Sequence, residues 1–347
     1  MPSTNPRTIA LCIALFLLSA FVTSTVKVSH IRHPHLSLPS FRGSRKSPQA
    51  NLAAPRLAYA TFLAAAGSEG DDHDAVPDEE DGYYVSTRVL AYQLLHSKTA
   101  GTNHSIPFLV LCTTDVAKRK RDRLKRDGAT IVLVEKLRSH WVQPSQERWR
   151  DVLVKLRLFQ LSQYHKILFI DADTLVTKPL DAVFHDEATL TQPTLANAAE
   201  MKQDEAPLPR TYMFASHGDS GGYNHAWPPN PDQSYLNSGF FIFRPDKELF
   251  KYYLSLLKLE GRFHPGLPEQ KLLNYAHRKE GTMPWQPLWY GWNINWPTEK
   301  DWRGGAHSFH AKFWDGDPSH DPGLRAIWKQ QKAEMEGYYR GRDKGGR

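Results

Sequence analysis

Two aspartates one residue apart follow an apolar run in the stretch KILFIDADTLV, residues 166–176. In an extended backbone, residues i and i+2 point to the same side, so Asp171 and Asp173 can face one ligand together. Carboxylate oxygens are hard ligands that suit Mg²⁺ or Mn²⁺. An aspartate that caps the following turn, beside a second surface aspartate, would leave the apolar run before the pair unexplained. The stretch therefore predicts a metal site at the carboxyl end of a buried strand, where ligands bind in open α/β sheets.

Strand-like and helix-like segments alternate before this pair, which predicts an α/β domain with a mostly parallel central sheet. Apolar runs typical of buried strands occur at 57–63, 106–114 and 129–137. Helices are expected between and after these runs, at 83–97, 118–126 and 148–164. Beyond the pair, the patterns predict a strand at 235–245, helices at 246–259 and 268–279, and a last short strand at 306–314.

The formal net charge of +7 is unevenly distributed along the 347 residues. Glu69–Asp81 carries eight acidic residues, whereas Lys118–Arg126 carries seven basic ones. Runs of like charge usually lie on solvated faces or in tails. No nucleic-acid-binding motif accompanies the basic segments, so no nucleic-acid partner is expected. The sequence leaves the oligomeric state open.

The N-terminal region has the composition of a membrane-targeting segment. Residues 8–26 contain no charged side chain, and nineteen residues at 1.5 Å each nearly span a bilayer core. We expect a short stub at 1–7, a signal anchor at 8–26, a stem at 27–55, one catalytic domain at 56–335 and a basic tail at 336–347. A cleavable signal peptide is the alternative for 8–26. The expected location is that of a single-pass type II membrane protein facing the Golgi or ER lumen, or a secreted protein after cleavage.

One resemblance of the aspartate stretch is to a phosphatase motif. FIDADTLV resembles the nucleophile motif of the haloacid dehalogenase superfamily, and GDPSHD at 316–321 resembles its acidic metal-binding motif. In that interpretation Asp171 would be the nucleophile and Asp173 the general acid and base. However, that motif normally occupies the first strand of its domain, and here three strand-like runs precede it. The segment before Gly316 is also not an apolar strand.

A second resemblance covers residues 56–315 and involves several separated stretches in the same order as in the family. They are similar to motifs of glycosyltransferase family 8, the glycogenin-like group: AYATFL with Tyr84 and Val85, LVKLRLFQL, FIDADTLV, YLNSGFFIFRP, PEQKLLN and HSFHAKFW. The resemblance implies a GT-A (Rossmann-like) nucleotide-diphospho-sugar transferase fold, a divalent metal (usually Mn²⁺, alternatively Mg²⁺), a UDP-sugar donor and retention of the anomeric configuration. The transferred hexose could be glucose, galactose or N-acetylglucosamine, and the acceptor a glycan, a protein or a lipid.

The same resemblance implies roles for individual residues. The metal ligands would be Asp171, Asp173 and His310, with His307 as an alternative to His310. For the nucleotide part of the donor, Asp171 would bind the ribose, Lys312 the diphosphate, and Tyr84 would stack on the uracil. For the sugar part, Lys155 and Asn237 would contact the donor sugar, and Ser238 and Gly239 would allow its close approach. Gln270 would lie beside the anomeric carbon.

Three departures from the family pattern leave substrate choice open. Glu269 stands where the family has an aspartate, Phe313 replaces a proline of the closing motif, and the acidic segment 69–81 is an insertion.

A cation next to a leaving diphosphate would act as a Lewis acid. A non-catalytic relative that binds a nucleotide sugar remains the third interpretation, although an intact set of metal ligands favours catalysis.

Overall fold

The computed structural model describes residues 56–65, 76–197, 199–230 and 234–345, all within the compact unit 53–347. The stub, signal anchor and stem expected at 1–55 therefore lie outside the described residues. Among the residues that are described, no helix has both the length and the hydrophobicity required to cross a bilayer.

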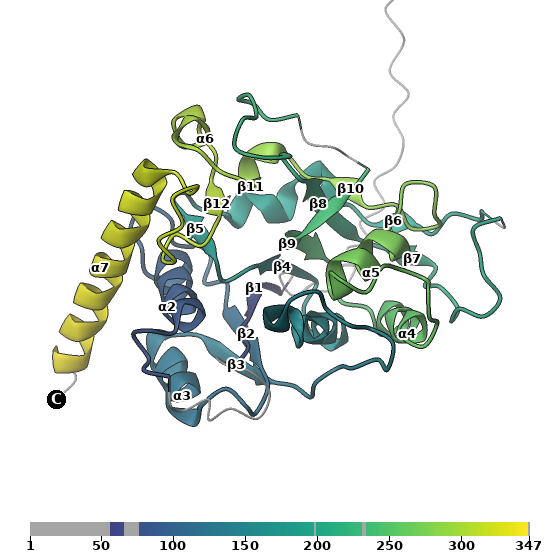
Figure 1. Ribbon diagram of the computed structural model, residues 1–347, viewed down its shortest axis with the longest axis horizontal. Coiled ribbons are helices and arrows are strands. Elements are labelled where there is room, and N and C mark those ends of the chain that lie inside the picture. The colour runs from purple at the N-terminus through teal and green to yellow at the C-terminus, as the bar shows by residue number, and fades with distance from the viewer. Residues whose placement is uncertain (1–55, 66–75, 198, 231–233, 346–347) are drawn as a thin grey trace, which may run out of the picture. The chain divides into compact units, whose positions relative to one another are not determined.

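A seven-stranded sheet in the order β10-β8-β9-β4-β1-β2-β3 forms the centre of the domain (Figure 1). Its strands are β1 (Leu57–Phe62), β2 (Phe108–Cys112), β3 (Thr130–Leu133), β4 (Lys166–Ile170), β8 (Phe214–Gly218), β9 (Leu236–Phe243) and β10 (Gln286–Pro287). Strand β1 pairs in parallel with β2 and β4, β2 with β3, and β10 with β8. Only β9 runs antiparallel to its neighbours, β4 and β8. The prediction of a mostly parallel sheet is confirmed.

Two smaller sheets complete the described strands. In the first, β12 (Ser308–His310) lies between β5 (Thr174–Val176), to which it is antiparallel, and β11 (Ile294–Asn295), to which it is parallel. The second pairs β6 (Gln192–Pro193) with β7 (Thr211–Tyr212). Because β5 follows the aspartate pair directly, the first small sheet brings a segment from near residue 310 to that pair.

Helices cover both faces of the central sheet (Figure 1). Helices α2 (Gly82–Leu95) and α3 (Lys118–Asp127) contribute to one core, and α4 (Lys247–Leu256), α5 (Pro268–Ala276) and the 3₁₀ helix η2 (Val152–Gln160) to the other. The amphipathic helix expected at 148–164 is thus 3₁₀ rather than α over most of its length. The remaining helices are η1 (Glu147–Trp149), η3 (Asp181–His185), η4 (Glu187–Thr189), η5 (Tyr290–Trp292), α6 (Glu299–Gly304) and α7 (Pro322–Gly345).

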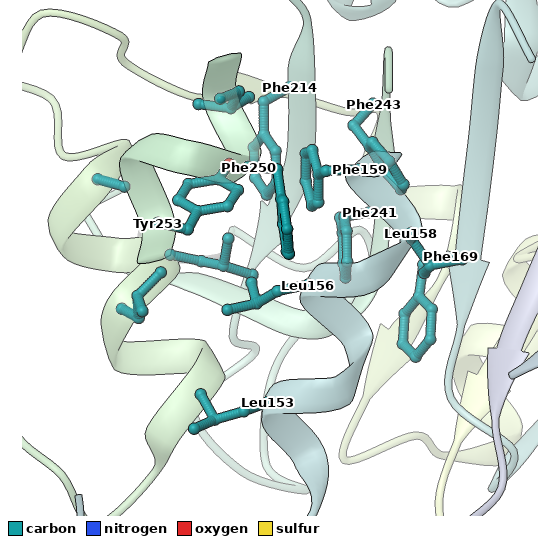
Figure 2. Packing of buried hydrophobic residues seen from close by; sticks show 14 of the residues in the cluster. Leu153, Leu156, Leu158, Phe159, Phe169, Phe214, Phe241, Phe243, Phe250 and Tyr253 are labelled. Carbon is teal, nitrogen blue, oxygen red and sulfur yellow. The ribbon is translucent and has the colours of Figure 1, made fainter. Parts of the chain in front are cut away.

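Alternating side chains of the strands divide between the two cores. Ile167 and Phe169 of β4 point to the core under η2 and α4, whereas Leu168 and Ile170 point to the core under α2. This is the period of two that a strand buried on both faces requires. Figure 2 shows the first core, in which the Phe159 ring from η2 packs against Phe243, with 4.1 Å between ring centroids. The η2 helix is therefore fixed against the sheet by an aromatic cluster.

The prediction of a basic tail at 336–347 is wrong for residues 336–345. These residues are the second half of α7, which lies beside α2 (Figure 1). The Tyr339 side chain is 1% exposed, and its hydroxyl donates a hydrogen bond of 3.2 Å to the main-chain oxygen of Asp127. The Asp127 carboxylate, buried at 0% exposure, pairs with Arg88 at 2.6 Å. The positive charge of this segment concealed a helix whose inner face belongs to the core.

Replacing Tyr339 with alanine should therefore destabilise the whole domain. Removing a large buried aromatic side chain costs about 3–5 kcal/mol of unfolding free energy. The matched control is Tyr338→Ala, because the neighbouring Tyr338 is 40% exposed and should cost less than about 1 kcal/mol. Urea unfolding followed by circular dichroism measures both values. Equal values for the two variants would show that the end of α7 is not part of the core.

Candidate active site

The aspartate pair lies in the turn between β4 and β5. The Asp171 main-chain nitrogen donates a hydrogen bond of 2.7 Å to the carbonyl of Gly239, and the Asp173 carbonyl accepts one of 3.0 Å from the nitrogen of Ala311. These two main-chain bonds fix the turn to β9 on one side and to the segment after β12 on the other. The pair is therefore positioned by two segments, β9 and the residues after β12, that are far from it in the sequence.

Asp171, Asp173 and His310 converge, as the sequence analysis predicted. One potential ligand atom from each lies within 4.8 Å of the others. The His310 Nε2 atom is 2.9 Å from the Asp173 carboxylate and 3.8 Å from that of Asp171. His310 reaches this place because β12 aligns it with Thr174 of β5. The alternative ligand, His307, lies elsewhere: its Nδ1 is hydrogen-bonded to the carbonyl of Pro179 at 2.8 Å.

Two lysines from different segments flank the carboxylates. The Lys155 ammonium, on η2, is 2.9 Å from Asp171 and 2.8 Å from Glu269. The Lys312 ammonium is 3.3 Å from Asp173. Lys155 is nearly buried, with 6% of its side chain exposed, and Lys312 is half-exposed at 27%. Lys155 therefore belongs to the floor of the site, and Lys312 is free to contact a ligand.

The charges of the site shift the pKa values of its residues in opposite directions. Burial alone would raise the pKa of the Asp173 carboxyl, but His310 and Lys312 hold it well below its ordinary value. Burial raises the pKa of Asp171 above its ordinary value, and the neighbouring Asp173 adds to the shift despite the opposing effect of Lys155. Burial would lower the pKa of His310, yet Asp173 and Asp171 raise it. These shifts show that the two carboxylates interact strongly with the three basic groups around them.

The residues expected around the donor sugar also come together. The side-chain oxygen (Oε1) of Gln270 accepts hydrogen bonds from the main-chain nitrogen of Ser238 at 3.0 Å and from the Ser238 hydroxyl at 3.1 Å. The Gln270 amide nitrogen donates to the Tyr235 hydroxyl at 2.9 Å. The Asn237 side-chain oxygen accepts from the nitrogen of Gly239 at 2.8 Å. Two adjacent segments, the start of β9 and α5, therefore hold these amides in fixed orientations.

Gly239 allows the His310 ring to lie against β9. A Cβ atom at this position would be 2.3 Å from Cε1 of His310 and 2.9 Å from the side-chain oxygen of Asn237. Neither atom can move without disturbing the cluster. The backbone must therefore carry no side chain here, which refines the expectation that Gly239 permits close approach of a ligand.

Glu269, the residue that departs from the family pattern, is a buried link between two predicted site residues. Its carboxylate accepts hydrogen bonds from Lys155 at 2.8 Å and from the Ser238 hydroxyl at 3.0 Å. A buried carboxylate requires such partners. The sequence marked the position only as an exception, and its pairing with Lys155, 114 residues away, could not be read from local pattern.

Most of the predicted site residues line one cavity of about 920 Å³. Its lining includes Lys155, Asp171, Asp173, Asn237, Ser238, Gly239, Gln270, His310 and Lys312 from the predicted set, together with Glu269, Arg148, Trp149 and Asp219. This volume is within the usual range for a small-molecule site.

Tyr84, which was predicted to stack on the uracil, does not line the cavity. Its ring is 1% exposed and packs in the core beneath α2, whereas Tyr83 lies in the cavity wall. Helix α2 begins after Asp81, whose carboxylate accepts a hydrogen bond from the nitrogen of Tyr84, and this start directs Tyr84 inwards. Helical spacing alone could not have chosen between the two tyrosines, because Leu90 and Ala91, seven residues after Tyr83 and Tyr84, are both buried in the same core.

A second group of potential ligands lies in the same cavity wall. Asp315, Asp317 and His320 have ligand atoms within 4.8 Å of one another, but both aspartates are exposed. The carboxylates already accept hydrogen bonds from the main-chain nitrogens of Asp317 and Ser319, each at 2.9 Å. These bonds are those of a turn, so we assign no metal to this group.

The sequence matches the family model described as "Glycosyl transferase family 8" over residues 80–306. The chain belongs to glycosyltransferase family 8.

An uncharacterised protein of Schizosaccharomyces pombe is 28% identical over 296 residues, which cover 76% of this chain and 77% of that protein. Glycogenin-1 of Homo sapiens is 26% identical over 198 residues, which cover 56% of this chain and 45% of glycogenin-1. The crystal structure of the galactosyltransferase LgtC with donor and acceptor sugar analogs aligns with a TM-score of 0.42 at 13% identity, over 80% of this chain and 95% of that one.

Family membership identifies the protein as a nucleotide-sugar glycosyltransferase. The alternative of a haloacid-dehalogenase-type phosphatase is thereby wrong. His310 and Lys312 lie beyond the matched range of 80–306, so their place in the site comes from the structure. Two carboxylates and an imidazole on one side of a cavity are a suitable ligand set for a divalent cation, and the imidazole favours Mn²⁺ over Mg²⁺.

If these three residues hold a cation, Asp173→Ala should abolish binding of Mn²⁺. The loss of free-Mn²⁺ signal in electron paramagnetic resonance measures binding during a titration, without any assay of activity. We expect one saturable site in the original chain and at least a 100-fold weaker one in the variant. The control is Asp315→Ala, which alters the second acidic group and should leave the titration unchanged. The opposite pattern would place the cation at residues 315–320.

Proposed function

We propose that this protein is a metal-dependent, retaining hexosyltransferase that uses a UDP-sugar donor. The observation that carries the proposal is the convergence of Asp171, Asp173 and His310 beside Lys312 in a cavity that also contains the fixed amides of Asn237 and Gln270. Mn²⁺ is the proposed cation, held by these two carboxylates and the imidazole, and when bound it would stabilise the negative charge of the leaving diphosphate.

The protein's own side chains would divide the donor between two parts of the cavity. Lys312 would contact the diphosphate with charge-assisted hydrogen bonds, since its ammonium is half-exposed beside Asp173. Asn237 and Gln270 would orient the sugar. Tyr83, in the cavity wall, replaces Tyr84 as the candidate for stacking on the uracil. Lys155, buried between Asp171 and Glu269, would hold the Asp171 carboxylate in place.

Retention of configuration is proposed to proceed by attack of the acceptor on the face from which the diphosphate leaves. A double displacement would need a free carboxylate at the anomeric carbon. Glu269, the carboxylate next to Gln270, is instead paired with Lys155 and bonded to Ser238. The departing phosphate oxygen would then take the proton of the acceptor hydroxyl.

Donor hydrolysis in the absence of acceptor tests this function. The full-length chain with Mn²⁺ should release UDP slowly from one of UDP-glucose, UDP-galactose and UDP-N-acetylglucosamine. EDTA and Asp173→Ala should each lower the rate at least 100-fold, because the leaving charge loses its stabilisation, whereas Asp315→Ala should retain it. Binding of UDP without turnover of any of these donors would instead indicate a non-catalytic relative.

We infer from residues 8–26 that the catalytic domain faces the lumen of the secretory pathway as part of a type II membrane protein. Only the composition of this segment supports the inference.

Protease protection of microsomes tests this location. In cells that express the full chain, a C-terminal epitope should resist added protease until detergent opens the vesicles. Deletion of residues 8–26 should leave the epitope sensitive from the start. Sensitivity of the full chain in intact microsomes would contradict the lumenal location.

A further inference from the structure

One exposed tryptophan in the wall of the active-site cavity has a backbone conformation that its residue type disfavours. Trp296 is 44% exposed, lines the cavity and has φ of 54°. Apart from glycines, only Ser105 shares a positive φ among the described residues. Left-handed backbone is strained at a bulky residue. An exposed side chain gains little from burial, so packing does not explain why tryptophan occupies this position.

Strand pairing links the segment that ends in Trp296 to the proposed metal site. Asn295, the residue before it, is the β11 partner of His310 in β12. Asp219, which also lines the cavity, directly follows β8. Trp296 and Asp219 therefore each follow directly after a short strand, β11 and β8 respectively.

The indole of Trp296 is held in one orientation by its neighbours. Its Nε1 donates a hydrogen bond of 2.9 Å to the Asp219 carboxylate, which also accepts one of 2.8 Å from the nitrogen of Gly221. The Tyr223 ring meets the indole edge to face, with 5.2 Å between centroids and an interplanar angle of 88°. An aromatic plane with a fixed orientation and a carboxylate at its edge thus borders the reaction cavity.

We propose that Trp296 and Asp219 form the acceptor subsite and that the acceptor is a saccharide. This inference rests on the proposed function. A pyranose ring presents an apolar face of C–H groups that suits an aromatic plane, and its hydroxyls suit a carboxylate. A lipid chain would require a continuous apolar lining, but the neighbours of Trp296 in the cavity wall are the polar residues Asp219, Tyr223 and Asn295. A rigid indole also binds with little loss of conformational entropy.

The variant Trp296→Gly separates this role from a structural one. Glycine adopts φ near 54° without strain, so removal of the indole should not lower the thermal midpoint of unfolding by more than a few degrees. The matched control is Trp302→Ala in α6, because Trp302 is 39% exposed and lies outside the described cavity lining.

The assay measures transfer from the active UDP-sugar, with Mn²⁺, to an array of plant, animal and microbial glycans. We expect saturable transfer to at least one glycan, a KM for that glycan at least tenfold higher in Trp296→Gly, and an unchanged KM in Trp302→Ala. An unchanged KM in Trp296→Gly, or no transfer to any glycan by a chain that still hydrolyses its donor, would overturn the inference. Absence of donor hydrolysis in the original chain would instead refute the proposed function.

Discussion

Two carboxylates of like charge lie side by side at the end of a buried strand, and the rest of the site is arranged around this constraint. Asp171 and Asp173 are 25% and 9% exposed, so water compensates their charges only in part. Removing an unpaired charge from water costs several kcal/mol, by an order-of-magnitude estimate. The structure offsets that cost with three cationic or titratable groups: Lys155 from η2, His310 from β12 and Lys312 after it.

Each compensating group constrains a different part of the fold. Lys155 reaches Asp171 only because the aromatic core fixes η2 against the sheet, as Figure 2 shows for Phe159. His310 reaches the pair because β12 is held between β5 and β11, and because Gly239 leaves room for the imidazole. The two sides differ in exposure. The Lys155 side is closed by Glu269 and buried, whereas the Lys312 side opens to the cavity where a diphosphate would lie.

The sequence was sufficient for features that depend on local pattern and failed where a distant contact decides. The apolar run before Asp171 and the alternation of strands with helices predicted the sheet and the position of Asp171 and Asp173 after a buried strand. The orientation of Tyr84 depended on where α2 begins, and the acidic residues before it obscured that start. The helical end of α7 was misread as a tail because its contacts are with distant residues, such as the pair of Arg342 with Asp127. The orientation of the Trp296 indole depends on its hydrogen bond to Asp219, 77 residues away, and no local spacing indicates that contact.

The most direct measurement of the central claim is a crystal structure of the chain with Mn²⁺ and UDP, with anomalous diffraction recorded at the manganese absorption edge. We expect one strong anomalous peak among the Asp171 and Asp173 carboxylates and Nε2 of His310, with Lys312 on the diphosphate. A peak at Asp315, Asp317 and His320 instead, or UDP bound with no peak near residues 171 and 173, would contradict the central claim.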